Sequence, residues 1–257
     1  MHTTLTTGAS SGIGAASARK FAALGRNVFL VARSEDKLIT ICNELGRVSG
    51  VRAQYFVIDL RDHDAPARLF EEVQRRELDI ELLVNNAGFG SMGYFDKLDL
   101  EHETQMIELN IRALVDLTHR FLIPMREKRQ GTIINVASTA GFQPVPFMAT
   151  YAATKAFVLS FSEALWEENR PFGVHVMALC PGVTETNFFE AARMDKPPMR
   201  GSQTPEEVVE AALRGLKRQR SSVISGWPNF FVAQAVRLFP RSVVLRVTGR
   251  VLRQRFE

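Results

Sequence analysis

Short apolar runs alternate with longer segments of helical periodicity along this chain of 257 residues. That alternation predicts an α/β fold, in which helices cover both faces of a single doubly wound parallel sheet of about seven strands. Some runs, such as 82–84 and 174–179, are almost continuously hydrophobic, as in strands buried on both faces. The expected strands are 3–7, 27–32, 51–58, 81–84, 132–136, 174–179 and 221–224, and the expected helices are 12–24, 34–46, 62–76, 99–128, 150–169 and 204–219.

The segments between these elements indicate one domain rather than several. No repeat, low-complexity tract or linker divides the chain, so we expect a main domain at 1–226 and a basic, helical extension at 227–257. Thr204, Pro205 and Glu207 have the spacing of an N-cap, a first-turn proline and a capping-box glutamate. The proline-containing segments 143–148 and 187–202 predict loops, which in such a fold line the ligand crevice.

Composition favours a globular protein without a metal site. Apolar residues make up 46% of the chain and charged residues 23%, and no apolar run of about 18 residues predicts a membrane-spanning helix. The first residues lack the basic and apolar regions of a secretory signal. Cys42 and Cys180 lie far apart without metal-ligand spacing, which favours two buried apolar side chains and a reducing, cytoplasmic location.

Basic residues are concentrated at the end of the chain. The whole chain has a net charge of +4, whereas segment 217–257 holds nine Lys or Arg and one acid, which leaves −4 for residues 1–216. This segment has neither a recognition motif nor interleaved aromatic residues of the kind that bind nucleic acid. We therefore expect no nucleic-acid partner.

A helix over 242–257 would be amphipathic. It places Arg246, Arg250 and Arg253 on one stripe, with Arg255 on the apolar side that holds Val244, Val247, Val251 and Leu252. Such a helix can lie on an anionic membrane surface or bind an acidic partner. The alternative is that its apolar side packs on its own domain or on a neighbouring subunit.

A glycine-rich turn follows the first expected strand directly. Residues 7–14 read Thr-Gly-Ala-Ser-Ser-Gly-Ile-Gly and lead into a helix. Glycines let a pyrophosphate approach backbone N–H groups at a helix N-terminus, where the dipole favours anions. The spacing G-x-x-x-G-x-G differs from the G-x-G-x-x-G fingerprint, so a purely structural bend remains an alternative to a dinucleotide site.

The tip of the second strand predicts which dinucleotide binds. Folds that select NAD place an acid here for the ribose 2′-hydroxyl, whereas an arginine accommodates a 2′-phosphate. This chain has Arg33 followed by Ser34 and no acid, and a guanidinium offers a planar fork of donors to phosphate. A surface arginine that caps the strand is the alternative. We expect NADP(H) to be preferred over NAD(H).

Tyr151 and Lys155 are four residues apart on an expected helix and therefore share one face. A neighbouring ammonium, with a cationic cofactor alongside, would lower the pKa of the phenol and make Tyr151 a general acid/base. A tyrosine packed beside a snorkelling lysine would have the same spacing.

Together these motifs make the chain resemble the short-chain dehydrogenase/reductase family, of the NADP-preferring type. The resemblance extends from about residue 5 to residue 186, and more weakly to about residue 225. It is carried, in family order, by the turn at 7–14, Asp59, the segment 85–88, Asn110, the segment 135–138, Tyr151 with Lys155, and the segment 181–186. It implies a Rossmann-like oxidoreductase that interconverts a ketone and a secondary alcohol.

The resemblance also implies roles for single residues. Tyr151 would exchange a proton with the substrate oxygen and Ser138 would hydrogen-bond that oxygen, while Lys155 would lower the tyrosine pKa and hold the nicotinamide ribose. Asn110 would hold a water that relays protons. The implied cofactor contacts are Gly8, Ser10, Ser11, Gly12, Ile13, Gly14, Arg33, Asp59, Leu60, Asn86, Ala87, Gly88, Tyr151, Lys155, Pro181, Gly182, Val183, Thr184 and Thr186.

The chain departs from the family pattern at three places. Thr154 stands where the family often has serine, and Ser11 stands where some NADP-preferring members carry a basic residue. The second departure leaves Arg33, with Ser10, as the expected anchor of the 2′-phosphate. The first strand, 3–7, is short and polar for a central strand, which leaves its N-terminal boundary open.

Apolar side chains dominate the loops that are expected to face the crevice. They predict a pocket for a lipophilic substrate, such as a 3-oxoacyl or steroid-like ketone, unless they merely close the core beneath long loops. The expected substrate contacts are Phe89, Phe142, Val145, Phe147 and Phe188, with Met148, Phe189 and Met194 also in these loops.

Two further expectations concern assembly and turnover. The helix at 150–169 is apolar on nearly all sides, which predicts contact with another subunit, and the resemblance implies a homodimer or homotetramer.

A cofactor-binding regulatory or scaffold protein of the same fold is the alternative to an enzyme. The presence of Asn110, Ser138, Tyr151 and Lys155 argues against it, because a sensor needs no proton relay.

Overall fold

A single sheet of seven parallel strands forms the centre of the protein, in the order β3-β2-β1-β4-β5-β6-β7. The structure, a computed structural model, describes residues 2–186, 188 and 201–253. The sheet confirms the predicted fold class and each expected strand, with small shifts at the strand ends. The strands are β1 (Thr3–Thr7), β2 (Asn27–Ala32), β3 (Ala53–Val57), β4 (Ile80–Asn85), β5 (Gly131–Val136), β6 (Val174–Cys180) and β7 (Ser222–Ile224).

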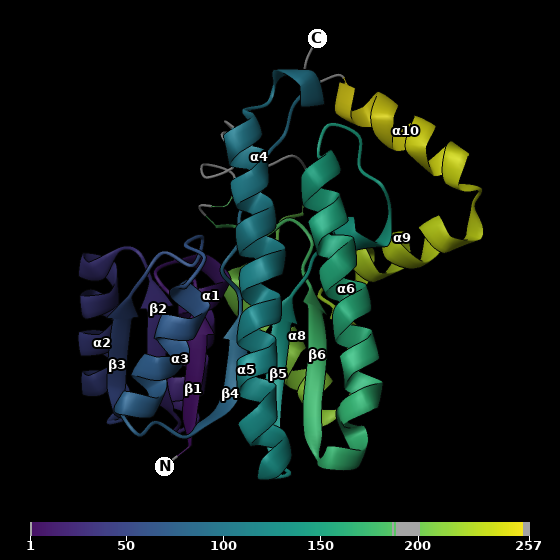
Figure 1. Cartoon of the computed structure of the whole chain (residues 1–257). Coiled ribbons are helices and arrows are strands. Elements are labelled where there is room, and N and C mark those ends of the chain that lie inside the picture. The colour runs from purple at the N-terminus through teal and green to yellow at the C-terminus, as the bar shows by residue number, and fades with distance from the viewer. Residues whose placement is uncertain (1, 187, 189–200, 254–257) are drawn as a thin grey trace.

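Helices cover both faces of this sheet (Figure 1). One face carries α1 (Gly12–Ala23), α2 (Glu35–Ser49) and α8 (Pro205–Lys217), and the other carries α3 (Ala65–Arg75), α5 (Leu114–Glu127) and α6 (Ala149–Asn169). The chain reverses its direction of winding between β1 and β4, and the ligand crevice of such sheets lies at the carboxyl ends of the strands at this point. Short 3-10 turns lie at Phe95–Lys97, Thr139–Phe142 and Arg170–Phe172.

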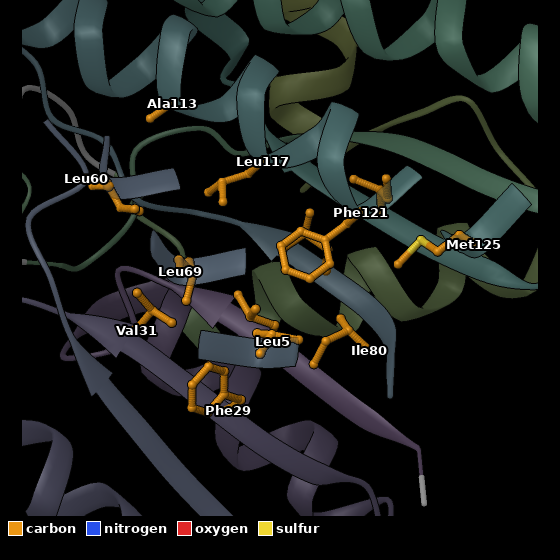
Figure 2. Close-up of a cluster of buried hydrophobic side chains, with 14 of the residues drawn as sticks. Leu5, Phe29, Val31, Leu60, Leu69, Ile80, Ala113, Leu117, Phe121 and Met125 are labelled. Atoms are coloured by element: carbon orange, nitrogen blue, oxygen red, sulfur yellow. The ribbon is translucent and has the colours of Figure 1, made fainter. Parts of the chain in front are cut away.

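The core on the second face joins the first strands to α3 and α5 (Figure 2). Leu5 of β1 and Phe29 of β2 pack with Leu69, Leu117 and Phe121, and all five side chains are buried. Because the sheet is covered on both faces, its strands have to be hydrophobic on both sides. This requirement explains why the apolar runs predicted the strands.

Strand β1 is buried along its whole length although four of its five residues are threonines. Its bounds match the expected 3–7, so the polar composition does not move its N-terminal boundary. The Thr7 hydroxyl accepts hydrogen bonds from the backbone N–H groups of Asn86 and Ala87, both at 3.0 Å. Thr7 therefore ties the end of β1 to the turn after β4, at the edge of the sheet where the ligand crevice is expected.

The predicted helix 99–128 is interrupted in its middle. It consists of α4 (Leu100–Ile107), a π-helical turn at Glu108–Ala113 and α5. The π turn contains Asn110, whose side chain bonds the backbone of Phe89. Such turns insert an extra residue into a helix and occur often at functional sites. By contrast, the predicted start of α8 is confirmed, because Thr204 and Glu207 form a reciprocal capping box.

Two helices, α9 (Trp227–Leu238) and α10 (Arg241–Arg253), form an arm at the end of the chain. In Figure 1 the arm extends beyond α6 and β6, with the connection between its helices farthest from the sheet. The helical extension expected at 227–257 contains both helices, although only 242–257 had been given as a helix span. No helix in the described ranges has the length and apolarity needed to cross a membrane. The predicted loop at 187–202 falls largely outside the described residues, as do Phe189, Met194 and Arg255.

Candidate active site

A cavity of about 850 Å³ lies at the carboxyl ends of the strands. It brings together most of the predicted site residues from distant parts of the chain. Gly14, Asn110 and Phe147 are not in its lining. The predicted residues that line it are Gly8, Ser10, Ser11, Gly12, Ile13, Arg33, Asp59, Leu60, Asn86, Ala87, Gly88, Phe89, Ser138, Phe142, Val145, Tyr151, Lys155, Pro181, Gly182, Val183, Thr184, Thr186 and Phe188.

The glycine-rich turn brings the N-terminus of α1 to the cavity. Gly8 has a φ of +63°, and a Cβ atom at Gly14 would lie only 2.3 Å from the Gly8 carbonyl oxygen. Gly14 therefore allows the close packing of helix against strand rather than lining the cavity. Ser11 makes no side-chain cap to the first turn, and Gly12 and Ile13 of that turn line the cavity. This arrangement fits the phosphates of a dinucleotide.

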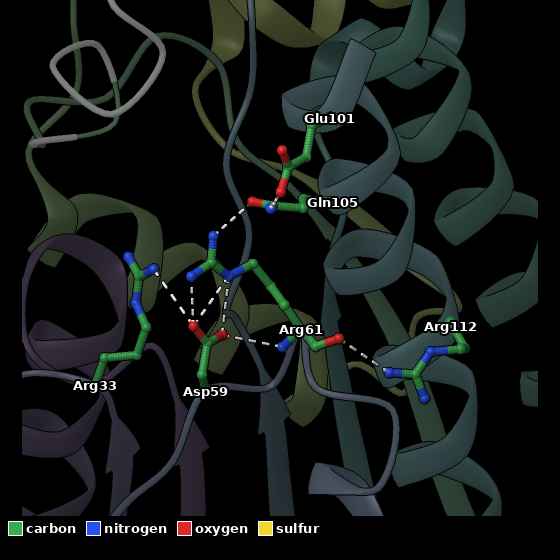
Figure 3. A network of polar contacts seen from close by, with 6 residues as sticks. All are labelled: Arg33, Asp59, Arg61, Glu101, Gln105 and Arg112. Atoms are coloured by element: carbon green, nitrogen blue, oxygen red, sulfur yellow. Dashed lines mark hydrogen bonds and ion pairs between the residues drawn. The ribbon is translucent and has the colours of Figure 1, made fainter. Parts of the chain in front are cut away.

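Asp59 and two arginines form a polar network at the β2 and β3 end of the cavity (Figure 3). Arg61 donates to both carboxylate oxygens of Asp59 and, at 2.6 Å, to Gln105. Burial alone would raise the pKa of Asp59, but the hydrogen bonds from Arg61 outweigh it and hold this pKa below its ordinary value. Arg33 lies 3.7 Å from Asp59, and its side chain is 65% exposed.

Arg61 was not among the predicted site residues. Because it neutralises Asp59, the carboxylate does not cancel the charge of Arg33 beside it. Two arginines therefore face one carboxylate at this end of the cavity, and the excess positive charge suits an anionic ligand. The spacing Asp59-Leu60-Arg61 after a strand was the signal available in the sequence.

Tyr151 and Ser138 place two hydroxyl groups side by side in the cavity wall. Tyr151 lies in the first turn of α6. Ser138 precedes the 3-10 turn after β5, and its side-chain oxygen accepts a hydrogen bond from the Ala140 N–H at 3.1 Å. Burial raises the pKa of Tyr151 to about 12, although a hydrogen bond with Ser138 opposes this rise. The phenol is therefore protonated at neutral pH.

The lowering of the Tyr151 pKa by Lys155 together with a cationic cofactor stays a prediction. The Lys155 ammonium donates to the Val136 carbonyl at 2.7 Å and lies 5.9 Å from the centre of the Tyr151 ring. It makes no resolved contribution to the Tyr151 pKa, which burial dominates. Burial also lowers the pKa of Lys155 to about 8, with a smaller opposing effect from Cys180. Spacing alone brings the two residues to one helix face but does not direct the ammonium at the phenol.

Asn110 lies behind the cavity wall. Its side-chain amide donates to the Phe89 carbonyl at 3.0 Å and to the Thr154 hydroxyl at 3.1 Å, and its oxygen accepts from the Phe89 N–H. A Cβ atom at Gly88 would lie 2.8 Å from the Asn110 oxygen and 3.5 Å from the Lys155 nitrogen. Any larger residue at this position would therefore clash with the Asn110 side chain.

The apolar part of the cavity comes from more of the chain than expected. The Phe188 ring lies 5.2 Å from the Tyr151 ring, whereas Phe147 packs edge-on against Tyr94 instead of lining the cavity. The main addition is the arm. Val247, Val251 and Leu252 belong to the apolar side for which packing on the same domain was the alternative, whereas the α9 residues form no motif. The arm residues in the lining are Pro228, Asn229, Val232, Ala233, Val236, Val247, Thr248, Val251 and Leu252.

A family profile described as "short chain dehydrogenase" matches residues 2–197. The chain belongs to the short-chain dehydrogenases. It is accordingly an oxidoreductase that acts on CH–OH groups, and NAD(P) is the cofactor class of this family. The family match covers the whole stretch that contains the glycine-rich turn, Ser138, Tyr151 and Lys155.

Named relatives support this assignment. The chain is 32% identical to a very-long-chain 3-oxoacyl-CoA reductase of Anas platyrhynchos, over 97% of this chain and 80% of that protein. A short-chain dehydrogenase from Sphingobium yanoikuyae in complex with NADPH is 35% identical, with a TM-score of 0.83 and 87% of each chain covered. A bulky-bulky ketone specific alcohol dehydrogenase from Comamonas testosteroni is 31% identical, with a TM-score of 0.79 and coverage of 93% and 92%.

Proposed function

We propose that this dehydrogenase uses NADPH to reduce a lipophilic ketone to a secondary alcohol. The observation that carries the proposal is the pair of hydrogen-bonded hydroxyls of Ser138 and Tyr151 in a largely apolar cavity. A hydroxyl pair of this kind can bind one carbonyl oxygen from two sides. The relatives named for 3-oxoacyl and bulky ketone substrates support the same substrate class, and a steroid-like ketone would also suit the cavity.

A protonated Tyr151 can serve as the proton donor for reduction. NADPH, when bound, supplies the hydride that the carbonyl carbon accepts. As negative charge develops on the oxygen, the Ser138 and Tyr151 hydroxyls stabilise it, and the Tyr151 proton completes the alcohol. A pKa of about 12 keeps that proton on the phenol until the substrate oxygen needs it. We propose that Lys155, Asn110 and a water return a proton to Tyr151 afterwards.

NADP(H) rather than NAD(H) is the proposed cofactor. Arg33 follows β2, where a 2′-phosphate would lie, and its guanidinium is exposed to the cavity. Ser10 and Ser11 line the same cavity and offer hydroxyl donors. Arg61 satisfies the carboxylate of Asp59, so no unpaired acid opposes a phosphate at this position.

Replacing Arg33 by alanine should weaken NADPH much more than NADH. Loss of a charge-assisted hydrogen bond costs about 1.5–3 kcal/mol, which corresponds to a roughly 10–100-fold rise in the Kd for NADPH. Fluorescence titration of both nucleotides measures the two Kd values. The matched control is Arg52→Ala, which removes an exposed arginine outside the cavity lining. Equal losses for NADPH and NADH in Arg33→Ala would contradict the proposed anchor.

The reaction itself is tested by following NADPH absorbance against ketones of increasing apolar size. We expect kcat/KM to rise with chain length or ring number, since the cavity has room for a large apolar group. Oxidation of NADPH with none of these ketones would favour the alternative, a protein that binds the cofactor without turnover. A preference for small polar carbonyls would leave the chemistry intact but overturn the proposed substrate class.

We also propose that α6 contacts a second subunit. Phe157 is 39% exposed and its ring stacks on Phe161 at 5.6 Å, which leaves an apolar surface on this helix. Burial of such a face in a symmetric dimer would remove it from water. Sedimentation equilibrium tests this proposal, and a monomer at all protein concentrations would contradict it.

A further inference from the structure

The arm formed by α9 and α10 has two different sides. One side of each helix lines the cavity, as Val232 and Val236 of α9 and Val251 and Leu252 of α10 show. The opposite sides face away from the cavity and form the outer surface of the arm. This outer surface is not needed for the site described above, so its composition requires a separate explanation.

The outer side of α9 is aromatic and exposed. Trp227 is 76% exposed, Phe231 64% and Leu238 83%, and their spacing of four and seven residues places them on one helix face. The Trp227 ring lies 6.2 Å from Phe230 and 6.3 Å from Phe231. Phe239 continues the apolar surface at the tip of the arm. A contiguous apolar surface of this kind indicates an interaction site.

The outer side of α10 is basic. Arg246, Arg250 and Arg253 are exposed and share one face of the helix, and Arg241 is exposed at its start. The sequence has no acidic residue from Ala211 to Arg253, whereas residues 1–216 carry a net charge of −4. The arm therefore combines exposed aromatic rings with a strong excess of positive charge in its sequence.

This combination decides between the possible partners. Pairing of the arm with the same arm of a second copy would bring arginines against arginines with no acid between them. An anionic bilayer complements both features, because tryptophan and phenylalanine suit the boundary between headgroups and acyl chains, and arginines suit anionic headgroups. We propose that the outer surface of the α9–α10 arm binds the surface of an anionic lipid bilayer.

Docking in this way would bring the cavity close to the bilayer, because the same two helices form part of the cavity wall. A lipophilic ketone dissolved in the membrane could then reach Tyr151 with little exposure to water. Only this consequence depends on the function proposed above. The docking itself is a property of the arm and requires no turnover.

Vesicle binding tests the docking directly. The intact protein should sediment with phosphatidylcholine vesicles that contain about one third phosphatidylserine, and much less with pure phosphatidylcholine or at high salt. The chain has two tryptophans, so Trp166→Phe leaves Trp227 as its only tryptophan reporter. The Trp227 emission of this variant should shift to shorter wavelength on the anionic vesicles. Absence of both sedimentation and shift would overturn the proposal.

Paired variants distinguish the arm from the rest of the surface. Trp227→Ser with Phe231→Ser, and separately Arg246→Glu with Arg250→Glu, should each weaken binding to anionic vesicles by about tenfold or more. The matched controls are Val48→Ser with Leu100→Ser and Arg47→Glu with Arg52→Glu, which change exposed side chains outside the arm. Equal losses in controls and arm variants would contradict a specific docking surface.

Two further measurements separate the remaining outcomes. If the arm variants change the mass in sedimentation equilibrium but not vesicle binding, the outer surface contacts a second copy and the membrane proposal fails. Tyr151→Phe should bind the same vesicles as strongly as the unchanged protein, since Tyr151 lies in the cavity wall and not on the outer surface. Vesicle binding by an inactive protein would show that docking holds even where the proposed reaction fails.

Discussion

Tyr151→Phe should reduce the rate of ketone reduction by about 10²–10⁴-fold, because it removes the proton donor and keeps the aromatic ring. The ring contact with Phe188 and the packing of α6 remain, so the fold should be unaffected. The loss should appear in kcat, whereas the Kd for NADPH should change little. Initial rates and a fluorescence titration of NADPH measure the two effects.

Tyr55→Phe is the matched control for this substitution. This variant loses the same hydroxyl group, but Tyr55 lies on β3, outside the cavity lining, where its hydroxyl is 3.4 Å from Glu35. It should keep the full rate of reduction. A Tyr151→Phe variant that retains about a tenth of the activity or more would contradict the role of Tyr151 as the proton donor.

The parts of the fold that follow from hydrophobic burial were predictable. The inner strands β2, β4, β5 and β6 are mostly buried apolar runs, and β1 is a buried run of threonines around Leu5, whereas the edge strands β3 and β7 are half-buried. The start of α8 was predictable because capping depends on local residues such as Thr204 and Glu207. Hydrophobic periodicity and local capping residues therefore predicted the strands and helices that carry the site.

The π turn and the bounds of α9 within the helical extension were not predictable in the same way. The π turn inserts one residue without a change in composition, and its reason, the bonds from Asn110 to Phe89, joins residues 21 positions apart. Helix α9 has apolar residues on both its cavity side and its outer side, such as Val232 and Phe231, so it lacks the one-sided pattern of an amphipathic helix.

The order of the motifs along the chain identified the site residues. It could not predict their hydrogen bonds or the shifts of their pKa values. The spacing of Tyr151 and Lys155 could not show that the ammonium bonds the Val136 carbonyl or that burial raises the phenol pKa. Both depend on the three-dimensional surroundings. The same holds for Arg61, whose importance appears only when it is seen to neutralise Asp59 beside Arg33.

Lys155→Met should make the protein more stable and nearly inactive. Lys155 is only 6% exposed, and a fall of its pKa from 10.5 to about 8 means that the buried ammonium costs about 3 kcal/mol of stability at neutral pH. Methionine fills a similar volume without a charge. Loss of the hydrogen bond to Val136 offsets about 1 kcal/mol, so the free energy of unfolding should rise by about 2 kcal/mol.

The stability gain should depend on pH in a defined direction. Native Lys155 releases its proton at about pH 8, whereas the unfolded lysine keeps it up to 10.5. Between these values the unfolded chain binds more protons, so the stability of the unchanged protein rises with pH and the advantage of methionine shrinks. Urea unfolding at several pH values across this window measures the difference, and Lys37→Met, at an exposed position, is the control.

The same substitution should lower the rate of ketone reduction by about 100-fold or more, because no ammonium remains to support proton return to Tyr151. Stability and activity would then change in opposite directions at one residue. That outcome is expected where a charge is held in the core for chemistry rather than for folding. A Lys155→Met protein that is less stable at neutral pH, or that keeps most of its activity, would show that the ammonium is held there for structural reasons instead.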